Sequence, residues 1–298
     1  MPRRSEEKDI LSSRSVIKYT KTRRGATNLN QYVIDHDLHI HSQLSLCSSD
    51  PGQTTGRILK YAEENGLTTI CLTDHFWDPE IPGATEWYKI QDLDHIKEAL
   101  PLPQSDNVRF MFGCETEMDK FFTIGVSDKL LGQLDFIIVP TTHLHMEGFT
   151  LDADIGFDED GIKRRRELYV ERFAKLLEAD LPFHKTGIAH LTCPLACARV
   201  KDGVIRLIDG ISDETFRELF YSAAAKGLGI ELNFDAFARA GAEKESEYRP
   251  YRIAKECGCK FYFGSDAHHP AELEKAVDNF KEIAKTLQLS ENDKFRPC

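Results

Sequence analysis

The chain places three histidines close together near its start. The stretch "IDHDLHIHSQLSLCSSD", residues 34–50, contains His36, His39 and His41, although the whole chain of 298 residues has only 11 histidines. Residues two positions apart in a β-strand point to the same face, so His39 and His41 would leave a strand side by side. Such a pair is either a metal chelate or a coincidence, and the rest of the sequence must decide between the two.

Other residues with metal-binding side chains follow further apolar runs. Seven short runs predict strands: "YVIDHDLHI", "LTTICLTD", "VRFMFGCE", "LDFIIVPTT", "KTGIAHL", "LGIELNF" and "KFYFGSD". At or near their ends stand Asp37, His39, His41, Asp74, His75, Glu115, His143, His190, Asn233, Asp266 and His268. A single histidine such as His143 would more simply be a buried imidazole that bonds a backbone carbonyl. A whole set of ionisable residues at the same end of successive strands is not core filling, and it needs a compensating charge that bound cations supply.

The strands alternate with segments that have helical spacing. These lie near residues 55–65, 161–179, 213–227, 246–257 and 270–287, and the alternation predicts an α/β fold of parallel strands joined by helices. Parallel strands point their carboxyl ends to one side, where the active sites of barrels and open α/β sheets form. We expect residues 33–298 to form a single domain and the polar residues 1–32 to form an N-terminal arm. The acidic insertion at residues 145–160, after the fourth strand, is typical of a lid or binding loop.

Composition restricts the class of protein. With 41% hydrophobic and 29% charged residues the chain falls in the ordinary globular range. The net charge of −11 opposes broad binding to nucleic acid, and the basic run "KRRR", residues 163–166, predicts a solvated helix face. The chain lacks an apolar run of the ~20 residues that a membrane span needs, and its start lacks a secretory signal, so we expect no membrane contact and a cytoplasmic location.

The eight cysteines lack paired CxxC spacing and are interpreted as small buried hydrophobic residues. Nothing in the sequence indicates the oligomeric state.

The predicted ligands mix imidazole nitrogen with carboxylate oxygen. That mixture suits Zn, Mn or Fe better than Mg or Ca, which prefer oxygen alone. The number of ligands exceeds what one ion can use, and a carboxylate such as Glu115 can bridge two ions. The sequence therefore predicts two or three divalent metal ions.

The same residues carry a resemblance to a known family. The pieces "DLHIHS" (37–42), "LTDH" (72–75), "GCE" (113–115), "TTH" (141–143), "AH" (189–190) and "GSDAH" (264–268) resemble, in order and position, the PHP family, the polymerase and histidinol phosphatase domain. The resemblance runs from about residue 35 to about residue 270. It implies a distorted seven-stranded (β/α) TIM-like barrel, in agreement with the number of strands predicted above.

The resemblance also implies a division of the ligands among three ions. His39, His41, Glu115 and Asp266 would hold the first ion, Glu115, His143 and His190 the second, and His75 and His268 the third. In relatives the remaining ligand of the third ion is an Asp or His shortly after the HxH pair, where this chain has Cys47 with Asp50 nearby. Cys47 as thiolate would suit zinc, and Asp50 before Pro51 is either a ligand or a turn residue. Asp37 and Asp74 are interpreted as partners of ligand histidines, with an acid role as the alternative.

A cluster of divalent ions predicts hydrolysis of a phosphate ester by a metal-bound hydroxide. The leaving alkoxide would take a proton from Asp266, His190 or His268. Arg199 and Arg239 lie just beyond the ends of the fifth and sixth predicted strands, and the resemblance implies that they bind the substrate phosphate; Arg164, Arg165 and Arg166 are weaker candidates. His145 and His269 flank predicted ligands and are candidate substrate contacts, whereas His36, His95 and His184 have no predicted role.

The acidic insertion favours a substrate that carries an amine. Histidinol phosphate carries one, so the sequence predicts a histidinol-phosphatase-like enzyme of histidine biosynthesis that acts on a small phosphomonoester. Two alternatives stay open. One is a PHP-type nuclease or phosphodiesterase, which would need a basic groove and aromatic stacking platforms. The other is a non-catalytic metal-binding PHP module, and its only support is that Cys47 stands where relatives have Asp or His.

Overall fold

The computed structural model describes residues 31–48, 50–233, 237 and 240–298. Most of the predicted N-terminal arm, and with it any test of that prediction, lies outside these residues. Gln31 and Tyr32, the last two residues assigned to the arm, pack on the domain: Gln31 bridges to Ser290, and the Tyr32 hydroxyl donates to the carbonyl of Phe261 at 2.8 Å.

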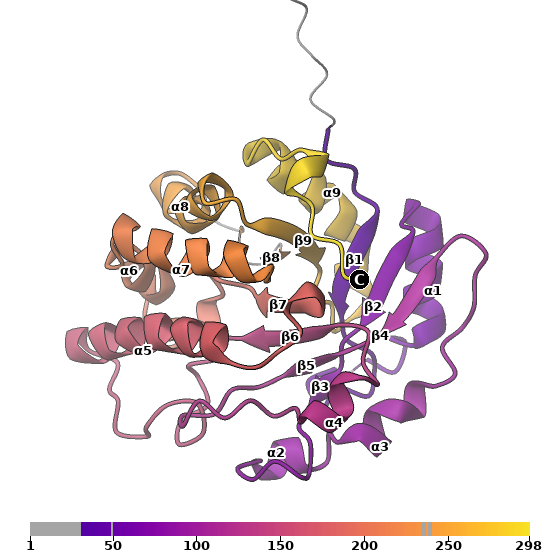
Figure 1. The fold of residues 1–298 in the computed structure, drawn as a ribbon, viewed down its shortest axis with the longest axis horizontal. Helices are drawn as coiled ribbons and strands as arrows, with labels where there is room; N and C mark the ends of the chain where they lie inside the picture. Colours follow the sequence, from indigo (N-terminus) through magenta and orange to yellow (C-terminus); the bar gives the residue numbers. More distant parts are fainter. Residues whose placement is uncertain (1–30, 49, 234–236, 238–239) are drawn as a thin grey trace, which may run out of the picture.

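The strands of the described residues form two parallel sheets (Figure 1). One sheet has the order β1 (His36–Ile40), β2 (Thr69–Leu72) and β4 (Arg109–Phe112). The other has the order β3 (His75–Phe76), β5 (Cys114–Thr116), β6 (Ile137–Pro140), β7 (Thr186–Ala189), β8 (Gly229–Asn233) and β9 (Lys260–Gly264). The prediction of an α/β fold with parallel strands is confirmed, whereas the predicted number of seven strands is wrong.

The strand number differs because one predicted run divides into two strands and a further short strand, β3, follows directly after another predicted run. Thr73 and Asp74 separate β2 from β3, and Gly113 separates β4 from β5. At Gly113 the chain changes neighbours: Phe112 pairs with β2 in the first sheet, and Cys114 pairs with β6 in the second. A side chain at Gly113 would collide with the carbonyl oxygen of Phe136, so only glycine fits where this run passes from one sheet to the other.

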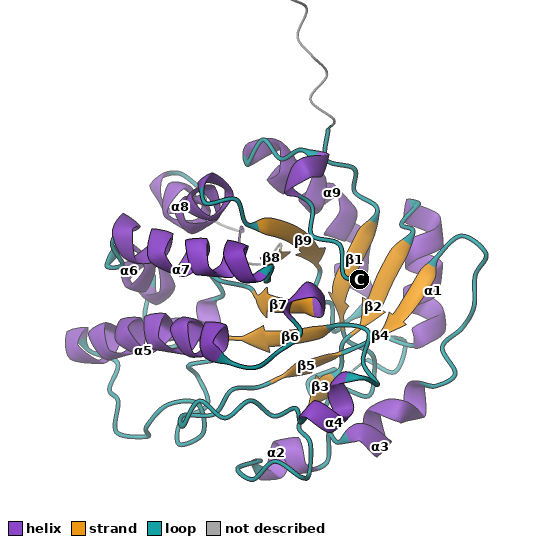
Figure 2. Cartoon of the chain, viewed as in Figure 1, coloured by secondary structure: helices purple, strands orange, loops and turns teal. Residues whose placement is uncertain are grey.

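Helices lie around the outside of the strands (Figure 2). The longer ones are α1 (Thr55–Asn65), α5 (Glu159–Glu178), α7 (Asp213–Lys226), α8 (Ala242–Glu256) and α9 (Pro270–Thr286), close to the five predicted helical segments. The shorter ones, α2 (Glu86–Lys89), α3 (Leu93–Ile96), α4 (Asp128–Leu131) and α6 (Gly203–Asp209), have no counterpart in the predicted segments. The acidic insertion after β6 is shorter than predicted, because Asp158 accepts a hydrogen bond from the backbone of Gly161 and α5 begins at Glu159.

Apolar side chains bury both faces of the strands. Leu38, Cys71, Met111, Ile138 and Tyr262 form one buried cluster with residues from both sheets, and a larger cluster lies between the strands and the helices. Strands covered on both faces read as continuous apolar runs, which is why these runs could be recognised as strands in the sequence. The two sheets adjoin at β1 and β9, where Ile40 bridges to Ala267.

The interpretation of the cysteines as buried hydrophobic residues holds for five of the eight, whereas Cys47 and Cys298 are exposed and Cys193 is partly exposed. All eight are free, and Cys71, Cys114, Cys197, Cys257 and Cys259 are buried. No helix of the described residues is long and apolar enough to cross a membrane.

Candidate metal centre

The carboxyl ends of the strands bring the predicted ligands to one place. β1 carries His39, and His41 follows its last residue; β5 carries Glu115 opposite His75 of β3. His190 directly follows β7, and Asp266 lies two residues beyond β9. Because all these strands are parallel, residues separated by more than 200 positions in the chain meet at one end of the sheets.

The structure gathers these side chains into three groups whose ligand atoms lie within 4.8 Å of one another. The groups are His39, His41, Glu115 and Asp266; Glu115, His143 and His190; and His41, His75 and His268. The first two coincide with the sets that the family resemblance implied for two ions. The third contains the expected His75 and His268 together with His41, which thus belongs to two groups.

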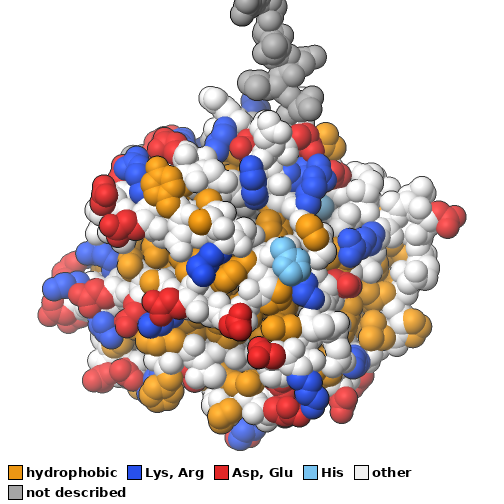
Figure 3. Space-filling view, viewed as in Figure 1, with side chains coloured by type: hydrophobic (Ala, Val, Ile, Leu, Met, Phe, Trp, Pro, Cys, Tyr) orange, Lys and Arg blue, Asp and Glu red, His pale blue; other side chains and the backbone are white. Residues whose placement is uncertain are grey.

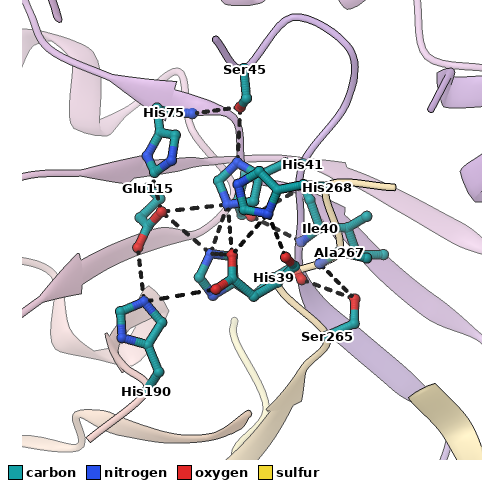
Figure 4. A network of polar contacts seen from close by, with 12 residues as sticks. His39, Ile40, His41, Ser45, His75, Glu115, His190, Ser265, Ala267 and His268 are labelled. Atoms are coloured by element: carbon teal, nitrogen blue, oxygen red, sulfur yellow. Dashed lines mark hydrogen bonds and ion pairs between the residues drawn. The ribbon is translucent and has the colours of Figure 1, made fainter. Parts of the chain in front are cut away.

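Glu115 lies at the centre of the cluster (Figure 4). Its Oε2 is 3.4 Å from His41 Nε2 and 3.0 Å from His75 Nδ1, and its Oε1 is 3.4 Å from His190 Nε2. The carboxylate therefore faces members of all three groups. This is the geometry expected of a carboxylate that bridges metal ions.

The hydrogen bonds around His41 show which of its ring nitrogens is free. His41 Nδ1 lies 2.9 Å from Ser45 Oγ, and Ser45 Oγ donates its single hydrogen to Asp74 at 2.7 Å. Ser45 Oγ must therefore accept from His41 Nδ1–H, which leaves Nε2 as the nitrogen that can bind a metal once it is deprotonated. Asp74 thus acts on a predicted ligand through Ser45, as the interpretation of Asp74 as a partner residue requires.

The nitrogens that face the cluster fit a metal ion better than they fit each other. His39 Nε2 and His41 Nε2 lie 3.0 Å apart. Once both rings have lost the proton on Nε2, as metal binding requires, two lone pairs face each other. Glu115 Oε1 and His75 Nδ1 are buried without a hydrogen-bond partner in the structure. A bound cation would stabilise these unpaired buried atoms and the two facing nitrogens. The mixture of nitrogen and oxygen ligands suits Zn, Mn or Fe.

Charge within the cluster displaces the pKa values of its members. Burial opposes ionisation of Glu115, but the charges of His39 and His75 hold its pKa well below its ordinary value. Burial likewise opposes protonation of His41, but hydrogen bonds to Asp266 and Glu115 raise its pKa to about 9. Protons on histidines therefore balance the carboxylates when no metal is bound, and metal binding should release protons.

The remaining predicted ligand positions do not join the three groups. Cys47 lines the pocket beside the cluster without belonging to a group. Asp50 accepts from the backbone of Gly52 at 2.7 Å and pairs with His269 Nε2 at 2.7 Å, which is the arrangement of a turn residue. Asp37 is buried and accepts from the backbone N–H of Ser265 at 2.9 Å, and burial raises its pKa to about 7. Asp37 therefore fastens β1 to the segment that carries Asp266.

A pocket of about 660 Å³ opens over the cluster. Its residues include Glu115, His143, Asp266 and His268 from the cluster. The walls add aromatic and other apolar side chains, Trp87, Tyr88, Met146, Phe149 and Leu195, together with the carboxylates Glu147 and Glu272. No Lys or Arg lines this pocket within the described part of the chain.

The predicted phosphate-binding arginines are not inside the pocket. Arg199 is exposed, and its Nη1 lies 3.0 Å from Oε1 of Glu147, a pocket residue, so Arg199 lies at the rim. Arg239 falls outside the described residues. Arg165 is 1% exposed and donates to the carbonyl of Gly156, so the prediction of a wholly solvated face for the basic run is wrong at this position.

The other histidines have local structural partners or lie in the pocket wall. His145 lines the pocket, in keeping with a substrate contact, and burial followed by the charge of His143 lowers its pKa to about 4. His269 caps α9 and pairs with Asp50 instead of lining the pocket. His36 pairs with Asp35, and His95 bonds the carbonyl of Leu44.

Two buried glutamates beside the cluster escaped the sequence analysis. Glu117 lies 2.8 Å from His143 Nδ1, and Glu231 lies 2.6 Å from His39 Nδ1. A signal for each was present: Glu117 is two residues from Glu115, on the same face of an extended segment, and Glu231 is a charge within the apolar run of β8. A carboxylate buried in a strand needs a partner, which identifies it as a candidate site residue.

Comparisons with known proteins find one matching family model and several similar proteins. Residues 37–235 match the model of the PHP domain. A protein of Deinococcus radiodurans named "Probable histidinol-phosphatase" is 25% identical over 260 residues, which cover 83% of this chain and 92% of the relative. A protein of Thermoanaerobacter sp. named a probable phosphatase is 25% identical over 256 residues, 85% of this chain and 84% of the relative.

A solved structure has the same fold. The crystal structure of histidinol phosphate phosphatase from Lactococcus lactis, complexed with zinc, L-histidinol and phosphate, aligns with a TM-score of 0.54 at 16% identity. The alignment covers 88% of this chain and 98% of that chain.

Proposed function

The chain belongs to the PHP domain family, and on this premise we propose that it is a metal-dependent phosphoesterase that hydrolyses a small phosphomonoester, with histidinol phosphate as the first candidate. The observation that carries the proposal is the convergence of three groups of histidine and carboxylate side chains beneath one pocket. The names of the relatives support a phosphatase.

The three groups would hold two or three divalent ions, Zn, Mn or Fe. His39, His41, Glu115 and Asp266 would bind the first, Glu115, His143 and His190 the second, and His41, His75 and His268 the third if it is bound. Such ions, when bound, lower the pKa of water toward neutrality and neutralise charge on the phosphate oxygens. Cys47 lines the same pocket and is the expected further ligand of the third group, although it does not belong to that group in the structure.

The chain's own residues orient the substrate and supply its proton. Asp266 and His268 line the pocket, whereas His190 does not. Burial opposes ionisation of Asp266, but the charge of His39 holds its pKa well below its ordinary value, so Asp266 stays an ionised ligand; we assign delivery of a proton to the leaving alkoxide to His268 in the protein whose third group holds no ion. His268 Nδ1 bonds the carbonyl of Asp266 at 2.7 Å, which leaves its Nε2 as the atom that would exchange the proton. Trp87 and Tyr88 shield His75 from water, with ring centroids 5.1 and 6.3 Å from the imidazole.

Recognition of the phosphate would fall to Arg199 and Arg239. Arg199 would have to leave Glu147 to bind the phosphate, and because the side chains of this ion pair are 65% and 33% exposed, breaking it costs ~0–1 kcal/mol. The phosphate therefore needs little binding energy to recruit Arg199.

The pocket walls favour a flat leaving group with a positive charge. Trp87, Tyr88 and Phe149 offer aromatic surface, and Glu147 and Glu272 offer carboxylates at the same pocket. Histidinol carries both a ring and an amine, so its phosphate matches these walls.

The two sheets would form one distorted barrel of the PHP type. Residues 69–76 and 109–116 each contribute strands to both sheets, and β1 meets β9 on the opposite side. Side chains from both sheets share the cluster of Leu38, Met111 and Tyr262, as an inward-facing barrel core would.

The test is phosphate release by protein that has been stripped of metal and reconstituted with Zn, Mn or Fe. The substrates are L-histidinol phosphate, an aryl phosphate and mononucleotides. A strong preference for histidinol phosphate is expected. Turnover of the aryl phosphate alone would rule out histidinol phosphate as the substrate. No turnover of any of these compounds by metal-loaded protein would rule out the proposal that the protein is a phosphatase.

The two alternatives have less support. A nuclease would want basic residues near the site, but the described pocket lining has none. The face shown in Figure 3, which carries the C-terminal segment, also has its Lys and Arg side chains interspersed with Asp and Glu. A non-catalytic module would be expected to have lost ligands, whereas the three groups are assembled.

A further inference from the structure

We propose that Glu117 and Glu231 are positioning residues that fix the proton of His143 and of His39 on Nδ1, and that each thereby sets the affinity of one metal group independently of the other. Glu117 would act on the group of Glu115, His143 and His190, and Glu231 on the group of His39, His41, Glu115 and Asp266. This inference rests on the proposed metal binding of the site.

The surroundings of Glu117 leave it a single orientation. Its Oε1 accepts from Arg172 Nη2 at 2.9 Å and from the backbone N–H of Met118 at 2.8 Å. Its Oε2 faces His143 Nδ1 at 2.8 Å. Glu117 and Arg172 are both fully buried, so no water substitutes for either contact. A carboxylate has no hydrogen to donate, so His143 must place its proton on Nδ1, and its Nε2 keeps the lone pair that a metal needs.

Arg172 itself is held by the strand ends that carry the site. From α5 its guanidinium donates to the carbonyls of Met118 at 2.8 Å, Thr141 at 3.2 Å and Pro140 at 3.2 Å. These carbonyls follow β5, which carries Glu115, and lie at the end of β6, which leads to His143. Arg172 therefore fixes the Oε1 end of Glu117 relative to the ligands.

Glu231 makes the corresponding contacts on the other side of the cluster. Its Oε2 accepts from the backbone N–H of His190 at 2.6 Å, and its Oε1 lies 2.6 Å from His39 Nδ1. Glu231 is fully buried as well. The backbone N–H of His190 thus fixes Oε2 of Glu231, as Arg172 fixes Oε1 of Glu117. Oε1 of Glu231 can only accept, so His39 must again carry its proton on Nδ1.

Glutamine at either position would keep the shape and reverse the hydrogen bond. In Glu117→Gln the amide oxygen must face Arg172 and Met118, which only donate, so the NH₂ group faces His143 Nδ1. Nδ1 must then accept, the proton moves to Nε2, and His143 loses its lone pair for the metal. In Glu231→Gln the oxygen must face the N–H of His190, and the same reversal falls on His39.

The experiment measures zinc binding by isothermal titration calorimetry and elemental analysis on wild type, Glu117→Gln, Glu231→Gln and the control Glu178→Gln. Glu178 lies on α5, is exposed and pairs with Lys175. Each buried variant should lose about 10–100-fold in affinity for one ion. The other ion should bind as in wild type, and the control should match wild type for both.

The second readout needs neither metal nor turnover. Ring ¹⁵N NMR of metal-free protein near pH 8, with the His143 signal assigned by its loss in His143→Ala, should show Nδ1–H in wild type and Nε2–H in Glu117→Gln. Wild type that already carries its proton on Nε2 overturns the inference even if Glu117→Gln does not fold.

The outcomes separate this inference from the proposed function. Wild type that binds no zinc defeats both. Wild type that binds two ions, together with glutamine variants that bind both equally well or weaken both to the same extent, defeats the positioning role alone, since a merely structural role would not select one ion.

Discussion

Replacing Lys294 by Met should destabilise the fold by about 2–4 kcal/mol and leave metal binding unchanged. The Lys294 side chain is 1% exposed, and its Nζ lies 2.9 Å from Asp35, 2.8 Å from Glu291 and 2.8 Å from the carbonyl of Val33. It thereby ties the C-terminal segment to the residues that lead into β1, at the end of the strands opposite the metal cluster.

The magnitude follows from the exposure of the two carboxylates. Breaking a buried ion pair by removing one partner costs about 3–5 kcal/mol. The side chains of Asp35 and Glu291 are 24% and 21% exposed, so water can replace part of what Lys294 provides. Methionine retains most of the apolar packing of the lysine stem, which confines the loss to the polar contacts and gives about 2–4 kcal/mol.

The loss should depend on pH. Burial opposes ionisation of Asp35, but hydrogen bonds from His36 and Lys294 lower its pKa, and Lys294 also lowers that of Glu291. Carboxylates whose pKa is lower in the folded state stabilise the fold above their unfolded pKa of about 4, and this contribution disappears as the pH falls through the folded pKa. The difference between wild type and Lys294→Met should therefore be full at pH 7 and shrink below about pH 4.

The assay is urea unfolding of metal-free protein at several pH values, with zinc stoichiometry measured on the same samples. Titrations in the metal cluster occur in both proteins and cancel in the difference. A loss below about 1 kcal/mol at pH 7, the value of an exposed pair, or a difference that does not change between pH 7 and pH 3, would refute the reasoning.

Further predictions concern the site. His143→Ala should abolish turnover and lower metal content together; full metal with retained activity, measured by elemental analysis and phosphate release, would contradict the proposed mechanism. Arg199→Ala should raise KM for the phosphomonoester by about 10-fold or more, as loss of a charge-assisted contact of about 1.5–3 kcal/mol implies, and Arg199→Lys should restore only part; an unchanged KM would remove Arg199 from phosphate binding. Trp87→Ala should reduce kcat/KM for histidinol phosphate more than for inorganic pyrophosphate or another substrate without a ring; an equal loss on both would show that the residue shapes the pocket without reading the leaving group. Zinc at 100 times its Kd should stabilise the protein by about 2.7 kcal/mol per site, seen as a rise in the unfolding midpoint that a chelator reverses; no shift would argue against binding to the folded state.

The candidate ligands could be found in the sequence because each follows an apolar run. His143 follows β6, and His190 follows β7 after the intervening helix α5. Because β6 and β7 are parallel, both histidines lie at the same end, so position in the chain was enough to predict their meeting. The longer helices were predictable for a similar local reason. In α1, Thr54 caps the first turn and Gly66 ends the helix at φ 68°, a conformation that favours glycine.

The strand number was not predictable because it depends on neighbours. The run at residues 109–116 reads as one strand, and only its pairing with β2 before Gly113 and with β6 after it divides the run. The residues of the pocket wall could not be predicted for the same reason, since they too depend on contacts with distant parts of the chain. Trp87 and Tyr88 lie in a short helix of a connecting segment, and nothing in their local pattern shows that this segment folds over His75.

Partners of the ligands were harder to identify than the ligands themselves. In the sequence, Arg165 and Arg172 both look like exposed residues of a charged helix. Arg172 is nevertheless completely buried, because Glu117 balances its charge and backbone carbonyls at the ends of β5 and β6 accept its other hydrogen bonds. Such burial depends on a contact across 55 positions of the chain. Asp74 was recognised as a partner because it directly precedes His75, whereas its route through Ser45 to His41 could not be read from spacing.

Two residues of the cluster adopt a backbone conformation that ordinary side chains avoid. His190 has φ 22° and Asp266 has φ 54°, and each such residue costs of the order of 1–3 kcal/mol. Glycine at position 266 would relieve this cost while deleting a ligand, so a variant library screened for thermal tolerance without metal should enrich inactive proteins at this position. At these two positions a substitution that relieves the backbone strain also removes a predicted metal ligand. Engineering for thermal stability should therefore keep His190 and Asp266 and change other positions of the chain.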